Sequence, residues 1–414
     1  MNTEEAITIE NNEVQKEIYG NSEEKASFFS TYINLTNTTI GAGTLSMHLV
    51  LRECGVILGL IIMFLAMLLS LYAYRTLIIS TNDTKTYNNK ELCKVVIANW
   101  SSYIFEIFII VCCIGTCCTY INVLSRSLGP HLRGMWGNVP IFNDYIACLL
   151  IVIFILLPLC CLRKIDFLSF TSTAAIISMI FVLIVVGIRL DSKTINSNIP
   201  LFRFDNFFGI MFVIPIMLFG YLNQSNMMPI YRELYNKSST KMTFIASLTM
   251  ITCFIMYATS GIVGYLSFYE LSSVKGNILD NFSQKDILIS IAKLFVYLTV
   301  TFSYPVIFYT AREGVFNIMN KKEIDDGLWY ITTIILMAIT YIIGTIVPNI
   351  SLLMNLSITL SGLFSNLVFP IAIYFIYYKS IWKRISSFIM LMVCLMLGVV
   401  GLTGAIMDIV NRLK

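Results

Sequence analysis

The sequence predicts an all-α membrane protein with about eleven transmembrane helices. Hydrophobic side chains make up 57% of the 414 residues, and charged side chains only 13%. Apolar runs of about twenty residues, long enough to cross a bilayer as a helix, recur along nearly the whole chain. Because these runs do not alternate as barrel strands do, and because lipid offers backbone polar groups no partner, they are interpreted as helices.

The predicted spans form one transmembrane domain, residues 28–414. In order, they are expected at residues 29–51, 56–80, 100–126, 144–162, 168–190, 206–230, 241–268, 286–310, 327–347, 350–378 and 384–410. Residues 1–27 are polar and acidic, and they lack the basic start and short apolar core of a signal peptide. They are expected to form a disordered cytoplasmic tail.

The distribution of Lys and Arg predicts which side each loop faces. If the N-terminus is cytoplasmic, the inner loops contain fourteen of these residues and the outer loops eight. Positive charge favours the cytoplasmic side, so a cytoplasmic N-terminus and an outer C-terminus are expected. The sequence leaves open a plasma membrane or a vacuolar or lysosomal membrane, and it leaves the oligomeric state unknown.

Two predicted spans contain glycine and polar residues where a plain membrane anchor would be continuous. The first contains Gly41-Ala42-Gly43-Thr44 after a polar run that begins at Asn34, and the sixth contains Phe219-Gly220-Tyr221-Leu222-Asn223-Gln224. Such interruptions persist at membrane depth only where the backbone lines a cavity or is buried in protein. Because the two breaks lie five spans apart, they predict a 5+5 inverted repeat with one extra helix, as in transporters.

Four stretches resemble the amino acid/auxin permease family, which includes the sodium-coupled neutral amino acid transporters and vacuolar amino acid transporters. They are Asn34-Leu-Thr-Asn-Thr-Thr-Ile-Gly-Ala-Gly-Thr-Leu, Pro229-Ile-Tyr-Arg-Glu-Leu, Gly264-Tyr-Leu-Ser-Phe-Tyr and Ser303-Tyr-Pro-Val. Their order and spacing are similar to those of the family over about residues 28 to 380. The resemblance implies a LeuT/APC-like fold and secondary amino acid transport by alternating access.

The two breaks are also the predicted substrate site on physical grounds. Free N–H groups after Gly41 suit the carboxylate of an amino acid, and free carbonyls near Phe219 to Leu222 suit its ammonium. Close helix packing is the alternative explanation of the glycines. The predicted substrate-binding residues are Gly41, Ala42, Gly43, Thr44, Phe219, Gly220, Tyr221 and Asn223.

For the coupling ion, the resemblance implies a sodium site between spans one and eight. Its predicted ligands are Asn37, the carbonyl of Ile40, Thr301 and Ser303, because a hard cation prefers oxygen. The alternative is that the hydroxyls bond to their own helix. Proton coupling stays open: relatives commonly have a histidine where this chain has Gln224, and His48 is the one histidine placed in a predicted span.

Other ionisable and reactive residues receive no role from the sequence. Glu106, Lys293 and Asp408 lie in predicted spans, but none is assigned as a proton relay, and Lys293 is expected to extend toward the outer surface. The cysteines at 112, 113, 117 and 118 are interpreted as helix-packing residues rather than a metal site.

Enzymes and nucleic-acid-binding proteins are not favoured. The sequence shows no nucleophile constellation, no cofactor loop and no phosphate loop, so no catalytic residue and no cofactor other than the coupling ion, Na⁺ or H⁺, is expected. The expected partners are an amino acid and the lipid bilayer. An amino-acid-sensing receptor without net transport remains the alternative function, with the acidic tail as its docking segment.

Overall fold

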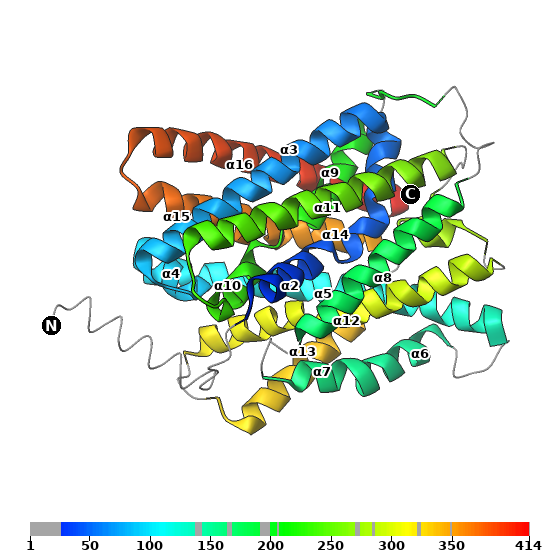
Figure 1. Ribbon diagram of the computed structural model, residues 1–414, viewed down its shortest axis with the longest axis horizontal. Coiled ribbons are helices and arrows are strands. Elements are labelled where there is room, and N and C mark those ends of the chain that lie inside the picture. Colours follow the sequence, from blue (N-terminus) through cyan, green and yellow to red (C-terminus); the bar gives the residue numbers. More distant parts are fainter. Residues whose placement is uncertain are drawn as a thin grey trace.

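The computed structural model describes residues 26–136, 143–163, 168–190, 199–204, 207–269, 274–283, 286–320, 324–347 and 350–413. Within these ranges the chain is helical apart from short connections, and its one bridge of β type pairs Ala26 with Leu234. Most helices lie along the long axis of the molecule (Figure 1). The predicted tail lies almost wholly outside the described residues.

The elements in chain order are α2 (Phe28–Ile40), η1 (Ala42–Ser46), α3 (Met47–Thr84), α4 (Asn89–Val96), α5 (Asn99–Trp136), α6 (Asp144–Ile151), η3 (Val152–Leu156), α7 (Leu157–Cys161), α8 (Leu168–Ile188), α9 (Phe207–Tyr221), α10 (Gln224–Glu233), α11 (Ser239–Phe268), η4 (Ile278–Asn281), α12 (Ile287–Met319), α13 (Asp326–Ile346), α14 (Ile350–Ser357), η5 (Ile358–Gly362), η6 (Phe364–Val368), α15 (Phe369–Tyr377) and α16 (Ile381–Leu413).

The described helices have the length and composition of membrane spans. Eight of them are long and apolar enough to cross a bilayer, and two shorter apolar helices cover Tyr145–Cys161 and Phe364–Tyr377. Large apolar side chains such as Phe154, Phe170, Ile334 and Val399 are exposed on the outside of the bundle, where lipid would contact them. The all-α membrane fold is therefore confirmed, whereas the count of eleven spans stays a prediction.

The connection between the first two predicted spans lies where the sequence places it. Element α3, Met47–Thr84, consists of two helices that meet at Gly55, whose φ of 74° and ψ of 171° are not helical. A side chain there would be strained, and its Cβ would lie 2.9 Å from the Leu201 carbonyl oxygen. The polypeptide thus turns at Gly55, where the backbone groups of Cys54 and Ile57 pair with residues 201–203 and not within the helix.

Helices α2 and α12 are each packed between two long helices. Helix α2 packs between α8 and α11, and α12 packs between α5 and α8. Helix α16 covers α9 and α15 from the outside and is the most exposed of the long helices. In Figure 1, α2 and α10 lie near the middle of the view, below α3 and α11. The two predicted breaks are confirmed, because α2 gives way to η1 at Gly41 and α9 gives way to α10 at Leu222-Asn223.

Two further irregular segments were not predicted. Spans four and ten contain turns of π-helix, η3 in one and η5 and η6 in the other. Such turns often occur at functional sites. In this protein η5 includes Ile358, which lines the central cavity described below.

Candidate functional site

The first break is a change of backbone direction at Gly41. Helix α2 ends at Ile40 because Gly41 takes φ 34° and ψ −148°, and a 3₁₀ turn begins at Ala42. A Cβ on Gly41 would lie 2.2 Å from the hydroxyl oxygen of Tyr120, so no side chain fits. The N–H groups that open a new helical turn have no partner within it. The break therefore offers donors at a place where only glycine is tolerated.

The second break meets the first one backbone to backbone. A Cβ on Gly43 would lie 2.9 Å from the Cα of Gly220. Asn223, in the connection between α9 and α10, donates its amide to Thr38 Oγ1 at 2.7 Å and to Thr39 Oγ1 at 3.2 Å. Two segments about 180 residues apart in the sequence are thus joined at one point in the fold.

Tyr257 of α11 bridges the two breaks, which the sequence did not indicate. Its hydroxyl oxygen lies 2.7 Å from the carbonyl oxygen of Thr39 and 2.7 Å from that of Gly220. A hydroxyl has one hydrogen, so it donates to only one of these carbonyls at a time. Its ring stacks edge-on against Tyr221, with centroids 5.0 Å apart. The site therefore retains an acceptor carbonyl that a cationic ligand can use.

A small cavity lies beside the two breaks. Its volume is about 20 Å³, room for about one or two water molecules, so the site is closed around less space than an amino acid needs. None of the described residues that line it is charged. The lining residues are Thr38, Thr39, Gly41, Cys112, Cys113, Thr116, Tyr120, Phe219, Leu222, Asn223, Asn226, Ile307 and Ile358.

The predicted substrate residues divide into two groups. Gly41, Phe219 and Asn223 line the cavity, and Gly43 and Gly220 form the contact beside it. Thr44 instead accepts a hydrogen bond from Ser260 on its carbonyl at 2.6 Å, and the carbonyl of Tyr221 accepts one from Ser70 at 2.8 Å. The side chain of Ala42 lies outside the described set. Which of these residues touch a substrate stays a prediction.

Span three supplies the wall of the cavity that the sequence missed. Cys112, Cys113, Thr116 and Tyr120 of α5 line it. Cys113, Thr116 and Tyr120 are spaced i, i+3 and i+7, which places these three on one face of the helix. The sequence does not indicate which face of α5 points to the cavity. Helix α5 is apolar around most of its circumference, so it has no apolar stripe that would show how the helix is rotated about its axis.

The predicted sodium ligands Asn37 and Ser303 lie together between α2 and α12. The Ser303 hydroxyl donates to Asn37 Oδ1 at 2.6 Å, and the Asn37 amide donates to Ser172 of α8 at 3.0 Å. The Ile40 carbonyl lies 3.3 Å from the Tyr257 hydroxyl oxygen. Thr301 is buried two residues before Ser303, about 200° around the helix. The ligand set stays a prediction.

Two polar clusters close the molecule beyond the cavity. One end of the bundle contains η4, and we call it the η4 end. There Ser46 donates a hydrogen bond to the Gly276 carbonyl at 2.8 Å, and His48 Nε2 lies 3.0 Å from the Lys275 carbonyl oxygen. There Lys293 is buried and paired with Asp280 at 3.6 Å, so the expectation that Lys293 extends to the surface is wrong. Burial raises the pKa of the Asp280 carboxyl, and the Lys293 ammonium opposes this shift.

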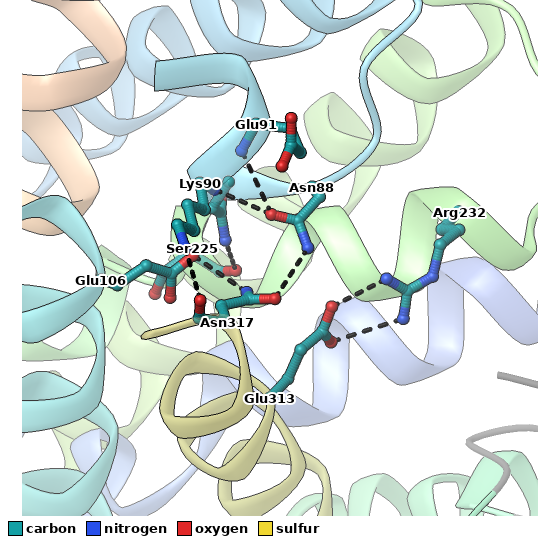
Figure 2. A network of polar contacts seen from close by, with 9 residues as sticks. Asn88, Lys90, Glu91, Glu106, Ser225, Arg232, Glu313 and Asn317 are labelled. Carbon is teal, nitrogen blue, oxygen red and sulfur yellow. Dashed lines mark hydrogen bonds and ion pairs between the residues drawn. The ribbon is translucent and has the colours of Figure 1, made fainter. Parts of the chain in front are cut away.

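The α4 end is the opposite end, where α4 and the last turns of α10 and α12 meet (Figure 2). Arg232 of α10 pairs with Glu313 of α12, with N–O distances of 2.7 and 3.4 Å. Asn88 caps α4 and also donates to Asn317 Oδ1 at 3.2 Å. The cavity is thus separated from both ends of the bundle by buried polar contacts.

The comparisons with known proteins agree with this architecture. Residues 24–410 match the family described as transmembrane amino acid transporter protein. The chain is 28% identical over 428 residues to "Amino acid transporter AVT6E" of Arabidopsis thaliana, covering 95% of this chain and 86% of the relative. It is 26% identical over 363 residues to "Vacuolar amino acid transporter 5" of Schizosaccharomyces pombe, covering 85% of each. The resemblance found in the four sequence stretches is confirmed.

Proposed function

Because the chain belongs to the transmembrane amino acid transporter family, we propose that it is a secondary active transporter that moves amino acids across a membrane by alternating access. The observation that most supports this proposal is the contact of the two broken helices, Gly43 against Gly220, beside a closed cavity. A membrane anchor has no need of two interrupted helices that meet. A transporter needs them, because unpaired backbone groups bind a charged ligand in the absence of water.

The two breaks suit the two charged groups of an amino acid. The N–H groups that open η1 after Gly41 would receive the carboxylate, and the N-terminal end of a helical turn favours negative charge. The Thr39 and Gly220 carbonyls, which share the single hydrogen of Tyr257, would receive the ammonium. The present cavity of about 20 Å³ then represents the closed form, and binding requires the site to widen.

The finer features of this proposal follow the sequence predictions. They are eleven spans in a 5+5 inverted repeat with an added helix, and a cytoplasmic N-terminus with the α4 end facing the cytoplasm. The S. pombe relative is named as vacuolar, and we propose a vacuole-type membrane for this chain in preference to the plasma membrane. Transport would be coupled to a sodium or proton gradient, with Asn37 and Ser303 as the sodium ligands in the first case.

Counterflow in proteoliposomes tests the transport proposal and the site together. Purified protein is reconstituted with a mixture of unlabelled amino acids inside, and entry of the same labelled amino acids is measured. Wild type is expected to take up label. Gly41→Leu and Gly43→Leu are expected to lose it, because a Cβ alone would lie 2.2 Å from Tyr120 and 2.9 Å from Gly220.

Gly187→Leu is the matched control, because nothing lies within 4 Å of a Cβ built on Gly187 of α8. It is expected to transport like wild type. Normal uptake by both break variants would overturn the site. Absence of uptake by wild type, with amino acids still raising its melting temperature, would overturn transport and indicate a sensing receptor.

A further inference from the structure

Glu106 is a buried carboxylate on the path between the cavity and the α4 end. It lies on α5, and its residue is only 1% exposed. Seven residues, two helical turns, separate it from Cys113, which lines the cavity, so both lie on nearly the same face of α5. The rise of a helix places Glu106 about 10 Å from Cys113 toward the α4 end.

Both carboxyl oxygens of Glu106 lie against α12. Oε1 accepts a hydrogen bond from the side-chain amide of Asn317 at 3.0 Å. Oε2 would lie 3.0 Å from a Cβ on Gly314, so the absence of a side chain there makes the room that the carboxyl occupies. Figure 2 shows Glu106 directed toward Asn317 and Lys90. The group is thus held in place by a neutral partner and by the backbone of α12.

The cations near Glu106 are bound to other groups. The Lys90 ammonium donates to the Asn317 carbonyl at 2.5 Å and to the Asn320 side chain, at the C-terminus of α12. Arg232 is paired with Glu313. Among the residues that the structure describes, no Lys, Arg or His forms an ion pair with Glu106.

Four titratable groups face Glu106: Glu313 of α12, Lys90 and Cys93 of α4, and Cys113 of α5. The Lys90 ammonium is the one cation among them and favours a charge on Glu106, but its hydrogen bonds go to Asn317 and Asn320. Glu313 is a second carboxylate, which disfavours a charge on Glu106, and the other two groups are thiols. A buried carboxylate without a cation partner is much more stable when it is protonated.

We propose that Glu106 is a proton-binding site that couples amino acid transport to a proton gradient. The proposal rests on the proposed function and names its coupling ion. In the closed form the carboxyl holds one proton. When α10 separates from α12 at the Arg232–Glu313 pair, water reaches Glu106, and the carboxylic acid gives its proton to water and becomes a carboxylate beside Lys90. Closure buries the group again, and a proton that reaches it from the η4 end through the cavity replaces the one released at the α4 end, so that one proton crosses the membrane in each cycle.

Glu106→Gln separates this role from a structural one. The carboxamide oxygen of Gln accepts the same hydrogen bond from Asn317, but the side chain no longer titrates. If Glu106 serves only to hold α12, the variant is expected to behave as wild type. If Glu106 binds the coupling proton, the variant loses the response to a pH gradient while it still exchanges amino acids.

The experiment measures two signals in the same proteoliposomes. Counterflow of labelled amino acids without any gradient reports whether the protein binds and moves substrate. A trapped pH-sensitive dye reports proton entry when amino acids are added. With one proton per amino acid, a gradient of about one pH unit supports up to about tenfold accumulation in wild type. In Glu106→Gln the accumulation is expected to fall to about onefold and the proton signal to disappear, with counterflow retained.

Glu91→Gln is the matched control, because it makes the same chemical change on α4 at a residue that points away from Glu106 in Figure 2. It is expected to keep the proton signal. Should Glu106→Gln fail in counterflow, Glu106→Asp is the second variant, which keeps a titratable group in a shifted position. Its proton signal is expected to persist with a shifted pH midpoint, and an unshifted midpoint would overturn the proposal.

The outcomes distinguish this proposal from the proposed function. Counterflow without any proton signal in wild type would overturn the proton site and leave transport intact. A proton signal of wild-type size in Glu106→Gln would overturn it as well. Absence of counterflow in wild type would instead overturn transport itself.

Discussion

At the η4 end the cavity is closed by a loop, whereas at the α4 end it is closed by helix against helix. Residues 274–283, the η4 loop, reach across the bundle. The Gly276 carbonyl accepts a hydrogen bond from Ser46 beside the first break, and Asp280 forms an ion pair with Lys293 of α12. At the α4 end, α10 itself is tied to α12 by Arg232 and Glu313. In the proposed transport cycle, opening of the η4 end would therefore move a loop, and opening of the α4 end would separate two helices.

The difference between the two ends indicates where a residue that couples proton binding to transport can lie. The broken helix α10 joins the second break directly to the Arg232–Glu313 pair, so in the proposed mechanism a change at the proposed substrate site would be transmitted along one helix. The η4 loop has no such continuity with either break. The proposed proton site at Glu106 lies next to the α12 partner of the Arg232–Glu313 pair, whereas the Asp280–Lys293 pair lies beside a loop.

Loss of the Arg232–Glu313 pair should have the largest effect. The side chains are 11% and 8% exposed, so Arg232→Ala leaves a largely buried carboxylate without its partner. Breaking a buried pair typically costs about 3–5 kcal/mol. We expect the free energy of unfolding in detergent, measured by denaturant titration, to fall by this order, and counterflow to fall with it.

The reciprocal variant, Arg232→Glu with Glu313→Arg, restores a pair of opposite charges in the same place and serves as the control. It should recover most of the loss. A free energy of unfolding for Arg232→Ala equal to that of wild type would show that the pair does not hold the α4 end.

Loss of the Asp280–Lys293 pair should have a smaller effect. The charged atoms are 3.6 Å apart, and the Asp280 side chain is 23% exposed. Asp280→Asn keeps the shape and a polar partner for Ser127, so we expect a loss of about 1–2 kcal/mol by the same titration. A loss as large as that of Arg232→Ala would remove the contrast between the two ends.

The smallest of the three effects is expected at the centre. Tyr257→Phe removes the hydroxyl that bridges the Thr39 and Gly220 carbonyls but keeps the ring against Tyr221. One buried hydrogen bond contributes about 1 kcal/mol. We expect a loss of that size, and amino acid binding measured by the ligand-induced rise in melting temperature should persist, because both carbonyls stay in place. Loss of binding would instead assign the hydroxyl itself to the substrate.

Residues with an unusual local chemistry could be predicted from the sequence. Gly41 and Gly220 stand out because glycine beside polar residues at membrane depth interrupts a helix, and both breaks are present. Asn37 and Ser303 were paired through the family resemblance, and the structure joins them at 2.6 Å.

The rest of the site depends on helix rotation and on loops, which an apolar sequence does not encode. Cys113, Thr116 and Tyr257 lie in helices that are apolar on most sides, so no stripe indicates which residues face the cavity. Asp280, the partner of Lys293, lies in a connection whose path is set by tertiary contacts. The break between the first two spans could be predicted from the short stretch around Gly55, and the structure has non-helical backbone at that residue.

Labelling of Cys113 with a membrane-impermeant maleimide, applied from one side at a time, tests alternating access around this cavity most directly. Cys113 lines the cavity, whereas Cys117, one turn away on α5 and fully buried outside the lining, serves as the internal control in mass spectrometry. We expect Arg232→Ala to raise labelling of Cys113 from the α4 side only, and Asp280→Asn to raise it from the η4 side only. Two results would contradict a cavity that is closed separately at the η4 end and at the α4 end. One is increased labelling of Cys113 from the same side in both variants, and the other is labelling of Cys117 to the same extent as Cys113.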